Sequence, residues 1–147
     1  MTKQINYQRP NSHIMRGDIY YSDLPPGIGS EQRGARPVLI LSNNIGNIKS
    51  PTVICAVISS SPNKAVMPTH VKIDHEIYPV KEGSFIMLEH IKTLSKQRLH
   101  GKICSLDATL MSEVNDKLKI SLGMQGMQFD ERSKRPKVPR GRRPKVI

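Results

Sequence analysis

The chain has 147 residues, and its 23 Lys and Arg against 12 Asp and Glu give it a net charge of +11. This length fits one domain, no apolar run is long enough to cross a bilayer, and the amino terminus lacks the apolar middle of a signal peptide. Two cysteines, Cys55 and Cys104, are too few to staple the domain and have no nearby partner at zinc-site spacing, so we expect a cytoplasmic protein whose basic excess indicates a polyanionic partner.

The predicted elements follow a polar segment, residues 1–14, which carries two cations and no acid and which we expect to be disordered. Short apolar runs separated by turn residues then predict about six strands with no helix between them. They lie at 18–22, 37–41, 52–58, 69–74, 84–88 and 99–103. The run at 52–58 is the most apolar and is predicted to be the central strand, whereas 69–74 alternates strictly and is predicted to be half-buried.

Two connecting segments are rich in residues that break regular structure. Residues 24–35 contain repeated Gly and Pro and predict a long loop, and residues 44–51 contain Asn and Gly and predict a turn.

A helix is predicted after the last strand, because apolar residues recur at i+4 and share one face. These residues are Leu106, Leu110, Val114, Leu118 and Leu122, with Met111 beside them. Asp107 or Ser105 is suited to cap its start, and Gly123 stands where a C′ glycine belongs. The fold class is therefore mainly β with a C-terminal helix (α+β), in which an antiparallel sheet closes into a small barrel.

The positive charge is concentrated at the two ends of the chain. Residues 132–147 carry +8 with no acid and three prolines, and residues 1–14 carry +2, which leaves only +1 for the body. A segment of this composition buries too little apolar surface to offset its ordering entropy, so we expect the tail to be disordered. We divide the chain into an N-terminal extension, 1–14, one domain, 15–124, and a basic tail, 125–147.

The residues alone indicate one weak anion site. The sequence has no Gly-rich phosphate loop, GxSxG or HExxH motif, and its carboxylates are not clustered as in a two-metal nuclease. Arg36 enters an apolar strand, so it is either a rim arginine paired with a carboxylate or a planar fork for a phosphate. Ser59 and the two serines after it are either ordinary strand-ending residues or hydroxyls that meet Arg36 at the barrel mouth. His70, on the alternating strand, is interpreted as a surface or packing histidine rather than a general base.

Several motifs occur together in one order along the body. They are Arg16-Gly17-Asp18-Ile19-Tyr20, Gly29-Ser30-Glu31-Gln32, Arg36-Pro37-Val38-Leu39-Ile40, Pro68-Thr69-His70-Val71 and Leu88-Glu89. In this register, from Met15 to Met124 without gaps, the sequence strongly resembles the MazF/PemK family of toxin endoribonucleases. The resemblance implies an SH3-like small β-barrel that forms a homodimer, is inhibited by an antitoxin with an acidic segment, and cuts single-stranded mRNA at specific sequences. It implies no metal, no cofactor and no membrane.

The resemblance also implies roles for individual residues. Arg36 matches the family's essential arginine, and Ser59 falls where the family has a catalytic threonine. This is a departure, since serine keeps the hydroxyl but loses the methyl group that stiffens χ1, and Ser60 is the alternative hydroxyl. Glu31 matches a loop glutamate and is our candidate for proton transfer. The matching motifs supply the candidate substrate-binding residues Gly29, Ser30, Gln32, Thr69, His70 and Glu89.

The implied reaction needs no protein nucleophile, because the RNA 2′-OH attacks the adjacent phosphate and expels the 5′-oxygen. Arg36 would stabilise charge on phosphorus, and Ser59 would donate a hydrogen bond to a non-bridging oxygen. Two alternatives remain: a non-catalytic barrel toxin such as a DNA gyrase inhibitor, and a degenerate family member that retains only antitoxin binding. The basic tail is expected to add non-specific, salt-dependent affinity for RNA.

Overall fold

The computed structural model describes residues 13–29, 31, 34–61 and 66–124, together with the backbone of two short strands further on. Within these residues six strands form one antiparallel sheet in the order β4-β5-β3-β2-β1-β6. The strands are β1 (Asp18–Leu24), β2 (Gly34–Ile40), β3 (Thr52–Ser60), β4 (His70–Lys72), β5 (Ser84–Ser95) and β6 (Leu99–Ser105). The helices are α1 (Asn44–Lys49), the 3₁₀ turn η1 (Lys96–Arg98) and α2 (Ala108–Ser121).

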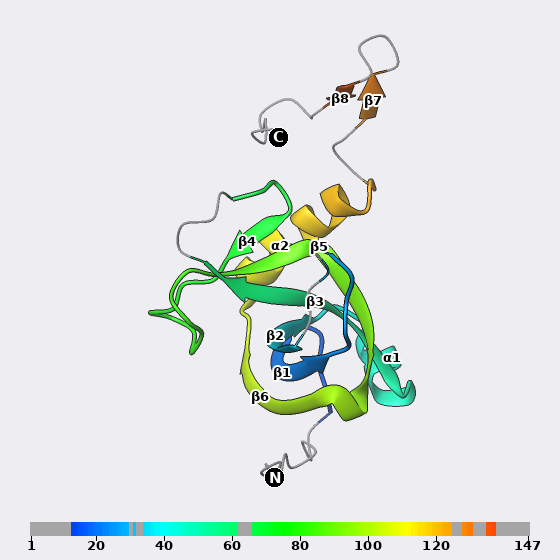
Figure 1. Ribbon diagram of the computed structural model, residues 1–147, viewed down its shortest axis with the longest axis vertical. Coiled ribbons are helices and arrows are strands. Elements are labelled where there is room, and N and C mark those ends of the chain that lie inside the picture. Colours follow the sequence, from blue (N-terminus) through cyan, green and yellow to red (C-terminus); the bar gives the residue numbers. More distant parts are fainter. Residues whose placement is uncertain are drawn as a thin grey trace.

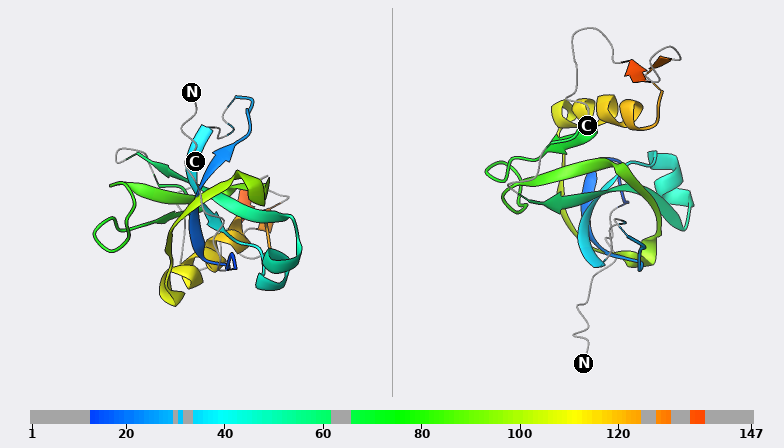
Figure 2. Two further views of the ribbon diagram at one scale, coloured as in Figure 1. Left: turned by 90° about the horizontal axis from the view of Figure 1, so that it is seen from below. Right: turned by 45° about the horizontal axis from the view of Figure 1, so that its top comes forward.

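The sheet is strongly curled, with α1 and α2 lying on its outside at well-separated places (Figures 1 and 2). Its two faces bury two separate hydrophobic clusters, because successive residues of a strand point to opposite faces. On β2, Leu39 joins the cluster covered by α2, whereas Val38 and Ile40 join the cluster inside the curl. Burial on both sides explains why 37–41 and 52–58 read as continuous apolar runs, and it confirms the expected mainly β fold with a C-terminal helix.

The C-terminal helix forms as the i+4 pattern predicts. The Asp107 side chain accepts a hydrogen bond from the Leu110 N–H at 2.8 Å and caps the start. Gly123 follows the end with a φ of +70°, which a residue with a side chain rarely adopts. Val114 is fully buried, but Leu122 is 56% exposed. The predicted apolar face was therefore wrong at Leu122, because the helix ends at Ser121 and the chain turns away there.

Residues 44–49 form the short helix α1, so the turn predicted at 44–51 was wrong. The Asn43 side chain accepts a hydrogen bond from the Gly46 N–H at 2.8 Å and so caps α1. Asn47 is 2% exposed, and its amide donates to the Ser42 carbonyl at 2.8 Å. Asn43, just before the predicted turn, therefore caps this six-residue helix, and Asn47, within it, anchors it.

Several strand boundaries also differ from the prediction. β1 extends to Leu24 and β2 begins at Gly34, so the loop between them is shorter than 24–35. β5 continues to Ser95, well beyond the predicted 84–88, because its second half bends and pairs with the start of β3. The strand predicted at 69–74 is limited to His70–Lys72.

The Arg16-Gly17-Asp18 motif holds the domain together. The Arg16 guanidinium donates to the Leu41 carbonyl at 2.9 Å and to the Asn115 side chain of α2 at 2.6 Å. Asp18 is 3% exposed and accepts from the Ser105 hydroxyl at 2.7 Å. Gly17 has a φ of +95°, which the tight bend before β1 requires. These contacts join β1, β2, β6 and α2.

The structure describes little of the two ends of the chain. Two short strands, β7 (Gln128–Asp130) and β8 (Arg135–Lys137), pair antiparallel, and the sequence did not predict them. The expected disorder of 1–14 and of the rest of the tail falls mostly outside the described residues and stays a prediction. In the described part of the chain, no helix is long and apolar enough to cross a membrane.

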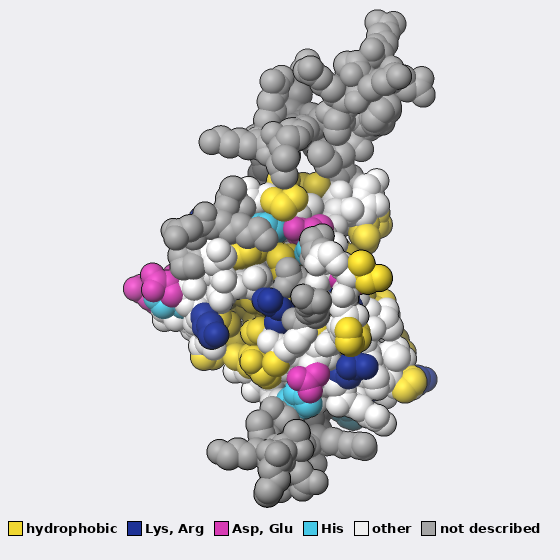
Figure 3. Space-filling model, in the orientation of Figure 1, with side chains coloured by type: hydrophobic (Ala, Val, Ile, Leu, Met, Phe, Trp, Pro, Cys, Tyr) yellow, Lys and Arg dark blue, Asp and Glu magenta, His cyan; other side chains and the backbone are white. Residues whose placement is uncertain are grey.

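The near-neutral charge of the body is visible on its surface. On the face shown in Figure 3, Lys and Arg occur in small separate groups among acidic and apolar side chains. The described surface on this side therefore has no broad basic patch, and an anionic ligand there must be attracted by a few individual side chains.

Candidate active site

The pairing of strands brings Arg36 and Ser59 together although they are 23 positions apart in the sequence. β2 and β3 pair Val38 with Val57, and the same antiparallel register continued by two residues places Arg36 opposite Ser59. Both then share the sheet face of Val38 and Val57. Arg36 is half-buried at the entrance of β2, and Ser59 is half-buried near the end of β3.

Arg36 and Ser59 line one cavity of about 220 Å³. Its other polar lining residues are Tyr21, Ser60, Lys81 and Ser84. Among the described residues that line it there are two cations and no carboxylate. A hollow with a guanidinium, an ammonium and several hydroxyls is suited to a phosphate, because each of these groups donates hydrogen bonds to anionic oxygen.

The register separates the two candidate hydroxyls. Successive residues of a strand face opposite sides of the sheet, so Ser59 shares the side of Arg36 whereas Ser60 shares the side of Ile58. Ser60 is exposed and pairs with Ser84 of β5, and Ser59 pairs with Phe85. The alternation therefore groups Ser59 with Arg36, although Ser60 and Ile58 also line the cavity.

A buried hydroxyl lies on the other side of Arg36. Ser22 of β1 is directly opposite Arg36 in the sheet and is fully buried. Its hydroxyl has no hydrogen-bond partner within the described residues. A buried hydroxyl without a partner is costly, and the strand register places Ser22 next to Arg36 in the sheet.

The loop between β1 and β2 carries the remaining candidate catalytic residue. Glu31 is exposed, and its N–H donates to the Ile28 carbonyl at 3.1 Å. A Cβ added to Gly27 would lie 2.7 Å from the Glu31 Cβ, so the loop can close on itself only with glycine there. Glu31 and the exposed Gly29 do not line the cavity as described. Ser30 and Gln32 lie outside the described residues.

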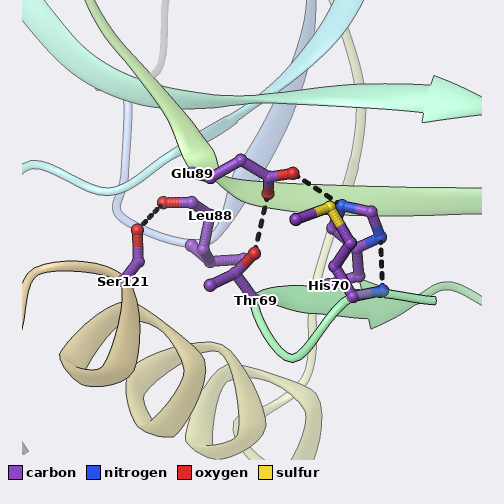
Figure 4. A network of polar contacts seen from close by, with 6 residues as sticks. Thr69, His70, Leu88, Glu89 and Ser121 are labelled. Atoms are coloured by element: carbon purple, nitrogen blue, oxygen red, sulfur yellow. Dashed lines mark hydrogen bonds and ion pairs between the residues drawn. The ribbon is translucent and has the colours of Figure 1, made fainter. Parts of the chain in front are cut away.

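Thr69, His70 and Glu89 form a compact network of polar contacts (Figure 4). Glu89 accepts hydrogen bonds from the Thr69 hydroxyl at 3.0 Å and from His70 Nε2 at 2.7 Å. His70 Nδ1 accepts from the Met67 N–H at 3.2 Å, so the ring proton belongs on Nε2. His70 is 3% exposed, and its ring packs on Phe85 with centroids 4.7 Å apart. The interpretation of His70 as a packing histidine agrees with this burial.

The network holds Glu89 in its charged form. Burial alone would raise the pKa of Glu89, but hydrogen bonds from its own backbone N–H, from His70 and from Thr69 outweigh burial and lower the pKa below its ordinary value. The ionised carboxylate therefore fastens the start of β4 to β5.

A second cavity of about 440 Å³ adjoins the first. His70, Lys72, Phe85 and Glu82 are among its lining residues, and Ser84 lines both cavities. The structure thus brings Arg36 and Ser59 to one cavity and His70 to the neighbouring one. Glu89 bonds to His70 and to Thr69 and so holds the His70 ring in place.

Lys81, Tyr21 and Ser84 are site residues that the sequence analysis did not identify. Lys81 belongs to the connection between β4 and β5 and reaches the cavity only because Ser84 pairs with Ser60. No spacing along the chain reveals this, since it depends on the register of β3 against β5.

Comparisons with known proteins identify the relatives of this chain. A family model described as PemK-like, MazF-like toxin of type II toxin-antitoxin system matches residues 15–122. Endoribonuclease EndoA of Bacillus subtilis (strain 168) is 50% identical over 111 residues, which cover 76% of this chain and 96% of that protein. Endoribonuclease MazF of Staphylococcus epidermidis is also 50% identical over 111 residues, covering 76% and 92%. A solved mycobacterial endoribonuclease in complex with its cognate antitoxin has a TM-score of 0.63 and 26% identity, covering 76% of this chain and 97% of that one.

Proposed function

The chain belongs to the PemK-like, MazF-like family and is a toxin endoribonuclease of a type II toxin-antitoxin system, and from this premise we propose that the cavity holding Arg36 and Ser59 cleaves single-stranded mRNA without a metal ion. The observation that carries the proposal is that these two residues line one hollow with no carboxylate among its described lining. An anionic phosphate there meets donor and apolar side chains but no carboxylate among the described lining residues.

The proposed reaction uses the substrate's own nucleophile. The RNA 2′-oxygen attacks the adjacent phosphorus, the bond from phosphorus to the 5′-oxygen breaks, and the products end in a 2′,3′-cyclic phosphate and a 5′-hydroxyl. The 2′-OH proton passes to a base, and the leaving 5′-oxygen takes up a proton. Arg36 stabilises the charge that develops on the equatorial oxygens, and Ser59 donates a hydrogen bond to one of them.

We assign the proton transfer to Glu31. It lies on the loop that leads into Arg36, and it is exposed and so can reach a bound RNA. Closure of this loop over the substrate would bring its carboxylate to the cavity. Gly29, Ser30 and Gln32 of the same loop, with His70 in the adjoining cavity, are proposed to contact the neighbouring nucleotides. Specificity then comes from unstacked bases read at their edges.

Two protein partners are proposed. The first is a cognate antitoxin with an acidic segment, as a similar endoribonuclease has been solved in complex with its antitoxin. The second is another copy of this chain. Ile45 and Ile48 of α1 and Ile54 of β3 are 70%, 51% and 45% exposed, and α1 packs on β3. Exposed isoleucines on adjoining elements support burial against a partner.

The basic tail is proposed to strengthen RNA binding without choosing the cut site. Residues 132–147 carry +8, and cations that neutralise phosphates release counterions, so the gain falls as salt rises. Deletion of 132–147 is expected to weaken RNA binding at low salt and to leave the cut site unchanged. A shifted cut site would show that the tail reads sequence.

One experiment tests the proposed function. Purified protein is incubated with long single-stranded RNA in EDTA, beside Arg36→Ala, and the ends of the fragments are determined. Discrete fragments with 5′-hydroxyl ends from the wild type alone are expected. Cleavage that disappears in EDTA, or that persists equally in Arg36→Ala, contradicts the mechanism. Absence of cleavage in any buffer favours the non-catalytic or degenerate alternatives.

A further inference from the structure

A second cation faces the proposed active site from the side opposite Arg36. β3 lies between β2 and β5 in the sheet, with Arg36 on β2 and Lys81 in the turn that leads into β5. Strands are spaced about 4.8 Å apart, so β2 and β5 stand roughly 10 Å apart across β3. Ser59, on β3, is thus bracketed by two positive charges that line one cavity.

The backbone of Lys81 is firmly placed. Its carbonyl accepts hydrogen bonds from the Ser84 N–H at 3.1 Å and from the Ser84 hydroxyl at 2.6 Å. Ser84 is 4% exposed and pairs with Ser60 of β3. Gly83, with a φ of +75°, allows the tight turn, and its carbonyl accepts from the Ser61 N–H at 3.3 Å. The turn therefore stays fixed relative to β3, although the Lys81 residue itself is exposed.

The two cations suit different tasks. A guanidinium offers a planar fork of donors that fits the oxygens of one phosphate. A lysine ammonium is a compact charge on a flexible stem, which suits a phosphate whose position varies. Because no carboxylate lines the cavity among its described residues, the charge of Lys81 is available to attract a second phosphate.

We propose that Lys81 binds the RNA phosphate next to the one that Arg36 and Ser59 hold. The inference rests on the proposed function, since it takes RNA as the ligand of this cavity. Lys81 is then a substrate-binding residue and not a catalytic one. It contributes to the capture of RNA and fixes the direction in which the strand crosses β3, while the reacting phosphate stays with Arg36.

The test compares Lys81→Ala, Lys81→Gln and Lys81→Arg with Lys119→Ala, an exposed lysine of α2. Steady-state cleavage of one RNA with a mapped cut site is measured at several salt concentrations. For Lys81→Ala and Lys81→Gln, KM is expected to rise about threefold to fivefold, the size of one exposed charged contact, with kcat unchanged. The slope of log(kcat/KM) against log[salt] is expected to become shallower by about 0.7, the value for one phosphate on a single strand. Lys81→Arg and Lys119→Ala should behave as the wild type.

Two results overturn the proposal. One is a KM and salt slope for both neutral Lys81 variants equal to those of Lys119→Ala. The other is a fall in kcat with KM unchanged, which would place Lys81 on the reacting phosphate. If the wild type does not cleave RNA, the proposed function has failed, and the same salt slope measured by binding of that RNA still tests Lys81. Thermal unfolding of each variant identifies any that does not fold, and Lys81→Gln keeps the length of the side chain.

Discussion

Two groups of polar residues from the same motifs lie in neighbouring parts of this domain, but their surroundings differ. Arg36 and Ser59 line an open hollow with a second cation and several hydroxyls. Thr69 and Glu89 bond to each other, and both ring nitrogens of His70 have partners in Met67 and Glu89 (Figure 4). The first group lines a cavity, whereas the polar atoms of the second group bond to one another and to Met67.

The difference suggests that the candidate residues have two different roles. Groups that face a hollow are placed to act on a substrate, and groups that satisfy one another hold the elements which shape that hollow. Because Ser84 lines both cavities, the network around His70 supports the wall next to the proposed reaction centre. Variants of Arg36 and Ser59 should therefore change the cleavage rate, and variants of Thr69 and Glu89 the stability of the fold.

Of the variants considered, Arg36→Ala should lower the cleavage rate most. Removing the group that stabilises charge on phosphorus is expected to lower the cleavage rate by about 10³-fold, the upper range for one preorganised donor. The single-turnover rate with saturating protein measures this directly. Arg36→Lys should retain more activity, because it keeps the charge but loses the planar fork. If the single-turnover rate of Arg36→Ala is within about threefold of the wild-type rate, Arg36 does not stabilise the transition state.

Ser59→Ala and Ser60→Ala form a matched pair with the same chemical change. Ser59→Ala is expected to lower the rate by about 10²-fold through loss of one donor to the phosphate, and Ser60→Ala to leave it nearly unchanged. The expectation rests on alternation: Ser59 shares the side of Arg36, whereas Ser60, which also lines the cavity, shares the side of Ile58 and pairs with Ser84. The reverse order of effects would assign the hydroxyl to Ser60.

Glu89→Ala tests the second group. It leaves the Thr69 hydroxyl and His70 Nε2 without their acceptor, so the free energy of unfolding should fall by about 1–3 kcal/mol. Denaturant titration at fixed protein concentration measures it, with Glu113→Ala on the exposed side of α2 as the control. The cleavage rate well below the unfolding temperature should change little. A large loss of rate in a stable Glu89→Ala protein would instead give Glu89 a role at the substrate.

The smallest expected effect is the contribution of Glu89 to the pH dependence of stability. The lowered pKa of Glu89 in the folded protein means that its ionisation stabilises the fold above the ordinary pKa of 4.5, and that this contribution is lost as pH falls through the lower folded value. From about pH 5 to pH 3 the wild type should therefore lose more stability than Glu89→Gln. If the free energy of unfolding falls equally with pH in the two proteins over this range, the ionised Glu89 does not stabilise the fold.

Sequence patterns predicted those parts of the fold in which burial follows a simple period. The runs at 37–41 and 52–58 and the i+4 series through Val114 became strands and a helix as expected. The capped helix α1 was missed because Asn43 and its neighbours have the composition of a turn. The length of β5 was missed because its second half, after Glu89, mixes charged and apolar residues and is only partly buried.

The candidate site was also predicted only in part. The family resemblance identified Arg36 and Ser59, and the structure brings them to one cavity. Lys81 could not be found, since its place depends on the pairing of Ser84 with Ser60 across two strands. The burial of His70 follows from contacts with Met67 and Phe85 that alternation on its own strand does not show.

The account depends most on the claim that this cavity cleaves RNA with the RNA's own 2′-hydroxyl. The direct measurement uses two RNAs that differ only by a 2′-deoxy nucleotide immediately 5′ of the mapped cut, with the wild-type protein in EDTA. The account predicts that the all-ribose RNA is cut and that the deoxy RNA is not cut there, although it still competes for binding. Cleavage of both RNAs at the same rate would contradict it.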